Sequence, residues 1–286
     1  MSFLEYATAG EDQFDFCLWP YPAVQPCDGK LRSISLLADS FEGQQTGRRA
    51  MDMVSAIREQ LGDLRTVWGV KQAGGEITWE FYFYDYARTE RERSIPRLLE
   101  IVRPWVSCDI HTSETAPYFM FSVDFSRQTL LMGGELDEVQ MYIGNIGSTV
   151  SSGICYGVAR HGIRLKNFYF FFDARKEMTE IEGKVCTSAY LDAANFKIDD
   201  VLWPELRDCQ VIVVANKPDR DGVYFSRISV TQLLWFLKKM RYPDKQIQFL
   251  ESNMDRLDHM LYDVGFDYRM EGGRLNILKS AYYGVF

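Results

Sequence analysis

Residues 67–86 read VWGVKQAGGEITWEFYFYDY, two apolar, aromatic-rich stretches joined by a turn that carries Gly74 and Gly75. Apolar and polar residues alternate along the second stretch, which is the period of a β-strand. A glycine-bearing turn between two such stretches is typical of a β-hairpin. We therefore predict an antiparallel hairpin at this position.

The same pattern returns four more times along the chain. Two copies match closely, CYGVARHGIRLKNFYFFFDAR at 155–175 and YDVGFDYRMEGGRLNILKSAYYG at 262–284. Two are looser, PYFMFSVDFSRQTLLMGGELDEVQMYIGN at 117–145 and CQVIVVANKPDRDGVYFSRIS at 209–229. Five hairpins supply ten antiparallel strands, which favours closure into a β-barrel.

The segments between the hairpins are interpreted from their periodicity. Residues 1–46 contain three prolines and little periodicity, so we expect an irregular segment that packs across one end of the fold. The charged run ARTERERS at 87–94 is expected to be solvated. Helices are predicted at 47–61, 95–105, 176–192 and 230–260, the last divided by Pro243.

Composition limits the class of protein. The chain has 286 residues, 47% of them hydrophobic, and a net charge of −8. That length fits a single barrel domain over 1–286, and an acidic balance argues against a nucleic-acid partner. No apolar run approaches the roughly 18–20 residues of a membrane span, and the first residues do not resemble a signal peptide. We expect a cytoplasmic protein without a membrane partner.

Motifs for several common sites are missing from the sequence. Six cysteines are scattered without a CxxC pair, as in a protein with reduced, buried thiols. The three histidines lack metal-ligand spacing, so we predict no metal site. Neither GxGxxG nor GxxxxGK[ST] occurs, and antiparallel hairpins do not fit a Rossmann fold. The predicted class is α+β, a ten-stranded antiparallel β-barrel surrounded by helices.

Alternation gives the strands two different faces. On 79–86, Trp79, Phe81 and Phe83 share one face, and Glu80, Tyr82, Tyr84 and Tyr86 share the other. The first face suits packing against helices. The second face is tyrosine-rich on the other strands too, and there it includes Gln140, Tyr142, Gly144, Asn167, Tyr169, Phe171, Tyr224, Ser226, Ile277, Lys279, Ala281 and Tyr283. We favour a barrel lumen over a solvated surface for this face, and such a lumen would be a ligand pocket.

Residues 47–286 resemble the ABBA prenyltransferases, ten-stranded barrels ringed by helices, and within them the branch that prenylates cyclic peptides. The sharpest match is the last strand, where the family places a basic residue on the diphosphate and an aromatic residue four positions later on the prenyl chain. Lys279 and Tyr283 stand at these positions. A second match is the strand with Asn167 and Tyr169, where related enzymes place lumen-facing Asn and Tyr.

The resemblance implies transfer of a short isoprenyl group, such as dimethylallyl, from its diphosphate to an aromatic small molecule or a peptide side chain. Lysines and arginines stabilise the leaving diphosphate, tyrosine faces shield the allylic cation, and a carboxylate takes the proton. Part of the family works without a metal ion, so no cofactor is required and Mg²⁺ is possible. The candidate residues are Lys279, Lys71, Arg160 and Lys217 for the diphosphate; Glu80 and Asp124 for proton transfer; and Tyr82, Tyr84, Tyr142, Asn167, Tyr169, Tyr224 and Tyr283 for the pocket.

The chain also departs from the family. The catalytic glutamate of the peptide branch falls near Val67, and Glu80, Gln140 and Gly144 stand where cations are expected. Arg227 is a further cation that lies beside a strand. The alternative is therefore a barrel that binds ligands without prenylating them, and a third reading is a barrel enzyme of other chemistry. Three or more cations converging in the lumen would favour the prenyltransferase, and one or none the binding protein.

Overall fold

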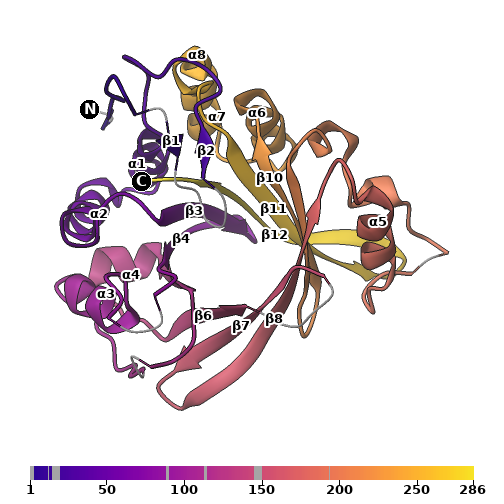
Figure 1. The fold of residues 1–286 in the computed structure, drawn as a ribbon, viewed down its shortest axis with the longest axis horizontal. Coiled ribbons are helices and arrows are strands. Elements are labelled where there is room, and N and C mark those ends of the chain that lie inside the picture. The colour runs from indigo at the N-terminus through magenta and orange to yellow at the C-terminus, as the bar shows by residue number, and fades with distance from the viewer. Residues whose placement is uncertain are drawn as a thin grey trace.

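In the computed structural model, ten of the twelve strands found in the described residues form a closed barrel (Figure 1). The structure describes residues 3–11, 13–14, 20–87, 90–112, 115–144, 150–192 and 194–286. The barrel strands are β3 (Thr66–Ala73), β4 (Glu76–Tyr84), β5 (Met120–Ser126), β6 (Glu138–Gly144), β7 (Ser152–Ala159), β8 (Gly162–Asp173), β9 (Val211–Asn216), β10 (Asp221–Ile228), β11 (Tyr262–Glu271) and β12 (Arg274–Gly284). The predicted ten-stranded antiparallel barrel is confirmed.

Each strand pairs antiparallel with the next one in the sequence, and β12 pairs back onto β3 to close the barrel. Tight turns join the strands of four hairpins at one end. In two of them a Gly-Gly pair has positive φ at both positions, 58° and 85° at Gly74 and Gly75, as a type I′ turn requires. The second predicted hairpin differs, because helix α4 (Arg127–Met132) lies between β5 and β6.

Helices cover part of the barrel's outer face. In the described residues they are α1 (Ile34–Gly43), α2 (Gly47–Leu61), α3 (Ile95–Val102), α4, α5 (Met178–Cys186), α6 (Val230–Lys239), α7 (Asp244–Ser252) and α8 (Met254–Leu257). The prediction for 47–61 is confirmed, as is the break at Pro243, which separates α6 from α7. The predicted helices at 95–105 and 176–192 are shorter than expected.

Two expectations for the segments between strands were wrong. Residues 1–46 are not wholly irregular, because α1 lies within them and is buried from Ile34 to Phe41. Its buried Ser35, Asp39 and Ser40 hide the apolar stripe by which a helix is recognised. The 87–94 run is not wholly solvated, although residues 88 and 89 lie outside the described residues. Arg91 is 7% exposed and donates from Nη2 to the carbonyls of Ala116 and Tyr118, at 2.7 and 3.0 Å.

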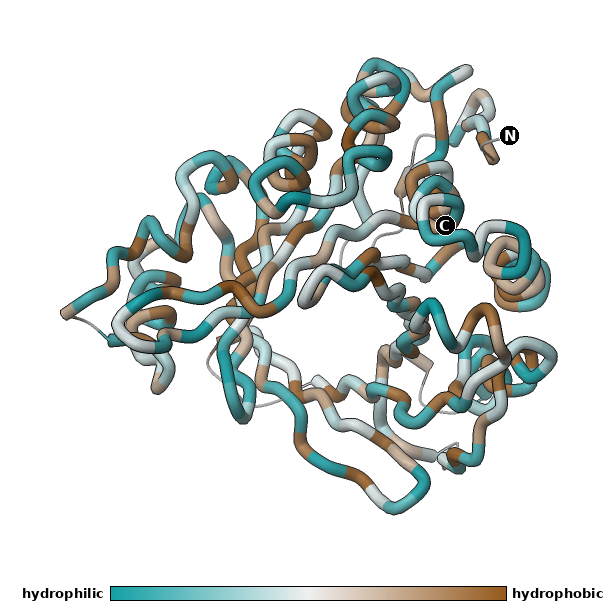
Figure 2. Tube along the Cα trace, turned by 180° about the vertical axis from the view of Figure 1, so that it is seen from behind, coloured by the Kyte–Doolittle hydropathy of each residue, from teal (hydrophilic) through white to brown (hydrophobic). Residues whose placement is uncertain are grey.

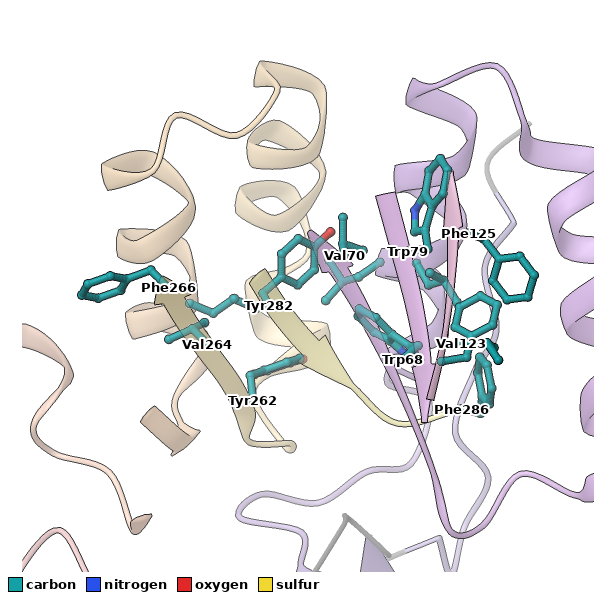
Figure 3. Packing of buried hydrophobic residues seen from close by; sticks show 14 of the residues in the cluster. Trp68, Val70, Trp79, Val123, Phe125, Tyr262, Val264, Phe266, Tyr282 and Phe286 are labelled. Carbon is teal, nitrogen blue, oxygen red and sulfur yellow. The ribbon is translucent and has the colours of Figure 1, made fainter. Parts of the chain in front are cut away.

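The main apolar core lies between the outer face of the barrel and the helices. Figure 3 shows part of it, with Trp68 and Trp79 from β3 and β4 and Tyr282 from β12. Trp79 is fully buried, and its indole N–H donates to Oγ of Ser40 in α1 at 2.8 Å. The alternation of the strands therefore sends large apolar side chains outward, which leaves the lumen to polar and tyrosine side chains.

The helical cover is incomplete. α1 packs on β3, α4 on β5, α5 on β8 and β9, and α6 on β11. In the described part of the chain no helix lies over β7 or the hairpin end of β8 (Figure 1), and the view from behind shows the same bare hairpin (Figure 2). Ile163, Leu165 and Phe168 of β8 are 64%, 45% and 38% exposed. Of the helices in the described residues, none combines the length and hydropathy needed to cross a bilayer.

Two short strands, β1 (Gln13–Phe14) and β2 (Tyr21–Pro22), belong to the N-terminal segment. Only part of this segment lies at an end of the barrel, because its helix α1 packs on β3. Tyr21 packs in an inner cluster with Val67, Tyr84 and Tyr283. Its hydroxyl donates to the carbonyl of Leu261 at 3.0 Å. Tyr21 therefore packs against two residues of the cavity wall, Val67 and Tyr283, at the end opposite the tight turns.

Candidate functional site

Five tyrosines form a belt inside the barrel, which we call the tyrosine belt: Tyr82, Tyr142, Tyr169, Tyr224 and Tyr283. Each comes from the outgoing strand of one hairpin, β4, β6, β8, β10 or β12. Successive rings are neighbours, with centroids 5.9 Å apart for Tyr283 and Tyr82 and 6.1 Å apart for Tyr82 and Tyr142. The belt continues to Tyr169 at 5.9 Å and to Tyr224 at 6.3 Å. Alternation of the strands predicts this inward orientation.

The tyrosine belt surrounds an open cavity of about 150 Å³. The lining residues come from the first residues of odd-numbered strands and the last residues of even-numbered strands, so the cavity occupies the end opposite the tight turns. Apart from the tyrosine hydroxyls, the polar side chains on its wall are Ser226 and Asp263. Burial raises the pKa of all five tyrosines far above the usual value, so they present neutral hydroxyls and aromatic faces.

A second group of inward side chains lies nearer the tight turns, and we call it the charged layer: Lys71, Glu80, Asp124, Lys217, Asp267 and Lys279. Glu80 precedes Tyr82 by two residues on β4, and Lys279 precedes Tyr283 by four on β12. Because alternate residues share a face, each pair points into the same lumen at different depths. The belt and the charged layer are thus neighbouring levels of one lumen.

The charged layer contains two ion-pair groups. In the first, Nζ of Lys71 lies 2.7 Å from Oε2 of Glu80 and also pairs with Asp124. The hydroxyl of Ser122 donates to Glu80 at 2.7 Å. Nε2 of Gln140 donates to Asp124 at 3.2 Å. Glu80 is therefore enclosed by partners, whereas 42% of the Asp124 side chain is exposed.

The second group is centred on Asp267. Its Oδ1 lies 2.6 Å from Nζ of Lys217, and its Oδ2 lies 3.4 Å from Nζ of Lys279. Nζ of Lys217 also donates to the hydroxyl of Tyr224 at 3.1 Å, which joins the charged layer to the tyrosine belt. Lys279 has the longest of these ion pairs, and 25% of its side chain is exposed.

Burial and ion pairing shift the pKa values of these groups in different directions. Burial opposes the charges of Lys71, Glu80 and Asp267, but their partners outweigh it, so the pKa of Lys71 is raised and those of Glu80 and Asp267 are lowered. Burial, with the Glu80 carboxylate beside it, raises the pKa of Asp124. Burial lowers the pKa of Lys279 to about 8, although Asp267 opposes that shift. Lys279 therefore holds its proton least firmly of the shifted lysines.

The formal charges of the charged layer cancel, since three ammonium groups face three carboxylates. Three lysines do converge in the lumen, as a phosphate site requires. An incoming anion would nevertheless have to compete with carboxylates already in place, because each ammonium group has a partner.

The structure brings most of the predicted site residues to the lumen, with some exceptions. Asn167 is buried there and donates from Nδ2 to the hydroxyl of Tyr169 at 3.0 Å. Arg160 does not join the lysines, because it lies in the tight turn that follows β7. Its side chain is 62% exposed and pairs with Asp109 at 3.0 Å. Tyr84 is buried beside Tyr21 and does not line the cavity. Arg227 lies at the mouth, where its guanidinium binds Gln210 and stacks over Tyr21.

The prediction that Ile277 shares the inner face with Lys279 was also wrong. A register shift in the β11–β12 pair, after Asp267 and Lys279, sets Ile277 opposite Tyr268. Tyr268 belongs to the outer core, so Ile277 lies on the outer face rather than with Lys279. A β-bulge adds a residue to one strand and reverses the alternation beyond it.

The sequence pattern did not indicate three functional candidates, Asp267, Asp263 and Ser122. Alternation places Asp267 between the outward Phe266 and Tyr268, which was a usable signal. Its position directly opposite Lys279 depends on the register of β11 and β12, which the sequence does not specify. Asp263 lies on the same strand, β11, an even number of positions before Asp267. Alternation therefore predicts that it faces the lumen too.

Comparison with protein families finds no match, and a search of curated proteins finds no significant relative. The fold and the side chains of the lumen therefore carry the functional argument. Because fold alone does not determine chemistry, the function has to be inferred from the two levels of the lumen, the tyrosine belt and the charged layer.

Proposed function

We propose that the barrel transfers a short isoprenyl group from its diphosphate to an aromatic or peptide acceptor, as its resemblance to the ABBA prenyltransferases implies. The observation that carries the proposal is the layering of the lumen, in which three lysines lie directly beyond a belt of five tyrosines. A diphosphate at the charged layer would place its isoprenyl chain among the tyrosine rings.

The bond changes assign a task to each level of the lumen. The C–O bond to the diphosphate breaks and its electron pair leaves with the diphosphate, where Lys217 and Lys279 offset the developing charge. The allylic cation lies between tyrosine faces, each worth about 0.5–2 kcal/mol. A new bond then forms to the acceptor, and the acceptor loses a proton to a carboxylate.

Asp124 suits the proton-accepting role better than Glu80. Its pKa is raised, and 42% of its side chain is exposed. Glu80 is held by Lys71 and Ser122, and its pKa is lowered, which weakens it as a base. Both carboxylates lie in the charged layer, so the proton of an acceptor in the tyrosine belt would move from the belt to that layer.

A diphosphate can bind in the charged layer only if Lys217 and Lys279 turn from Asp267 towards it. Lys279 is the weaker partner, at 3.4 Å and with a pKa lowered to about 8, so we expect it to turn towards the diphosphate first. Among the described residues, no group of three or more His, Cys, Asp or Glu side chains could hold a metal ion by itself.

The test is incubation of the protein with labelled dimethylallyl diphosphate and a panel of aromatic small molecules and cyclic peptides. Inorganic diphosphate binding is measured in parallel by calorimetry. Transfer that is lost in Lys279→Met supports the proposal. Absence of both transfer and diphosphate binding would refute it.

The cancelled charges of the charged layer favour a second candidate, a barrel that binds an aromatic ligand without prenylating it. Three carboxylates that already neutralise three lysines leave no net positive field for a diphosphate. This candidate predicts that aromatic ligands bind while inorganic diphosphate does not. The same calorimetric series therefore separates the two functions.

A further inference from the structure

The cavity wall carries a single charged side chain among the described residues. Apolar side chains and the tyrosine belt make up nearly all of the wall, and Asp263, near the start of β11, is the exception. Asp263 is the direct cross-strand partner of Tyr283 and of Ser226, so it stands level with the outer edge of the belt. A carboxylate in such a wall demands a structural explanation, because burying an unpaired charge is costly.

The surrounding backbone fixes the carboxylate in place. Oδ1 of Asp263 accepts a hydrogen bond from the backbone N–H of Arg227 at 2.8 Å. Arg227 has a φ of 64° at a register shift in β10, and this conformation aims its N–H at Asp263. A strained residue held in this way indicates that the orientation is specified by the structure.

Asp263 has no ion-pair partner among the residues that the structure describes, in contrast to the carboxylates of the charged layer. The guanidinium of Arg227 binds Gln210 and stacks over the ring of Tyr21. Its charge and a hydrogen bond with the Ser226 side chain lower the pKa of Asp263, but they do not offset the effect of burial. Burial raises the pKa of Asp263 to about 6, which is the effect of a carboxylate that is poorly solvated and incompletely compensated. It is nonetheless ionised above that pH.

We propose that Asp263 binds a cationic group, an ammonium or a guanidinium, on the ligand that enters the cavity, while the ligand's apolar or aromatic body lies against the tyrosine belt. A cation at this point would supply the missing ion-pair partner, and hydrogen bonds to charged groups are among the stronger ones. Tyrosine faces next to it attract the same charge. If the proposed transfer function holds, the cation belongs to the acceptor, because the diphosphate belongs in the charged layer.

The test compares three ligands that share one phenol ring and differ in charge: tyramine, neutral 4-ethylphenol and anionic 4-hydroxyphenylacetate. Calorimetry is performed on the full chain at about pH 8 and low salt, without isoprenyl diphosphate. We expect tyramine to bind about tenfold more tightly than 4-ethylphenol, and 4-hydroxyphenylacetate to bind least well. The series on the unmodified protein tests the proposal even if a variant does not fold.

Two variants locate the effect. Asp263→Asn keeps an oxygen for the N–H of Arg227, and it should abolish the preference for tyramine while leaving the affinity for 4-ethylphenol within about twofold. Asp208→Asn is the control, since that side chain is 88% exposed and removes the same charge outside the cavity. The control should retain the preference.

The proposal is overturned if tyramine and 4-ethylphenol bind equally, if the preference survives Asp263→Asn, or if none of the three ligands binds at millimolar concentration. These results are independent of prenyl transfer, because no isoprenyl donor is present. Charge-selective binding without any transfer would refute the transfer function alone, and transfer to neutral and cationic acceptors alike would refute the role of Asp263 alone.

Discussion

Tyr224 and Gly265 are direct cross-strand partners in β10 and β11, and the tyrosine ring occupies the space where a side chain at position 265 would stand. A β-carbon on Gly265 would lie 2.1 Å from Cδ1 of Tyr224. Tyr283 lies over Gly69 in the same way, with a closest approach of 2.6 Å. Two members of the tyrosine belt, Tyr224 and Tyr283, therefore depend on glycines opposite them, a pairing that also protects glycine backbone within a sheet.

Gly265→Ala should displace the ring of Tyr224 and disturb the belt. Overpacking of this kind costs about 1–3 kcal/mol, which urea denaturation would measure as a lower free energy of unfolding. Gly183→Ala is the matched control, because a β-carbon there would meet nothing within 4 Å and the residue lies in helix α5. Equal stability of the two variants would contradict the packing described for Tyr224.

Lys71→Met should leave Glu80 and Asp124 facing each other without their shared cation. Removing one partner of a buried ion pair costs about 3–5 kcal/mol, and Lys71 is only 6% exposed. The control Lys176→Met breaks a surface pair with Asp173 whose lysine is 82% exposed, and should cost under about 1 kcal/mol. Partial recovery of stability in the double variant Lys71→Met/Glu80→Gln would identify the buried charge as the cause.

Lys279→Met should weaken the binding of inorganic diphosphate by about tenfold or more if the charged layer holds that group. Because the pKa of Lys279 is lowered to about 8, the lysine loses its charge above that pH. Binding by the unmodified protein should therefore weaken as the pH rises from about 7 to about 9. Calorimetry at several pH values checks both statements, and a pH-independent affinity equal in both proteins would exclude Lys279 from the site.

The stability of the protein should depend on pH through Asp39. Burial raises the pKa of Asp39 to about 6, and its Oδ2 has no hydrogen-bond partner among the described residues. A carboxyl whose pKa is raised by folding stabilises the fold at low pH, and this contribution is lost as the pH rises through the folded value. The unmodified protein should thus lose up to about 3 kcal/mol relative to Asp39→Asn between about pH 4 and pH 7. The control Asp52→Asn, on the exposed face of α2, should show the same pH dependence of stability as the unmodified protein. If the stability of Asp39→Asn also changes with pH in parallel with that of the unmodified protein, the prediction is wrong.

The cysteines should differ strongly in reactivity. Cys155 and Cys209 are buried, and burial raises the pKa of each thiol to about 12. Since the thiolate is the reactive form, iodoacetamide should modify the exposed Cys186 first and reach the other two only after unfolding in urea. Peptide mass spectrometry measures this order. Early labelling of Cys155 would contradict this order.

The site was predictable to the extent that it follows from alternation along single strands. Tyr82, Tyr142, Tyr169, Tyr224 and Tyr283 face the cavity because each occupies an inward position on its strand. Arg160 was misplaced because it lies at a strand end, where alternation no longer fixes the direction of a side chain. Ile277 was misplaced because a bulge shifts the register, and no residue in its neighbourhood marks that shift.

The amino-acid sequence by itself determined the five hairpins and the two faces of their strands, because turn residues and a period of two are local properties. Only the tertiary structure decided which charges meet. Asp267 faces Lys279 and Lys217, Glu80 and Asp124 share Lys71, and Asp263 has no ion-pair partner among the described residues. These relationships depend on register and closure across ten strands, and a shift of one residue in any pairing would turn its side chains to the other face.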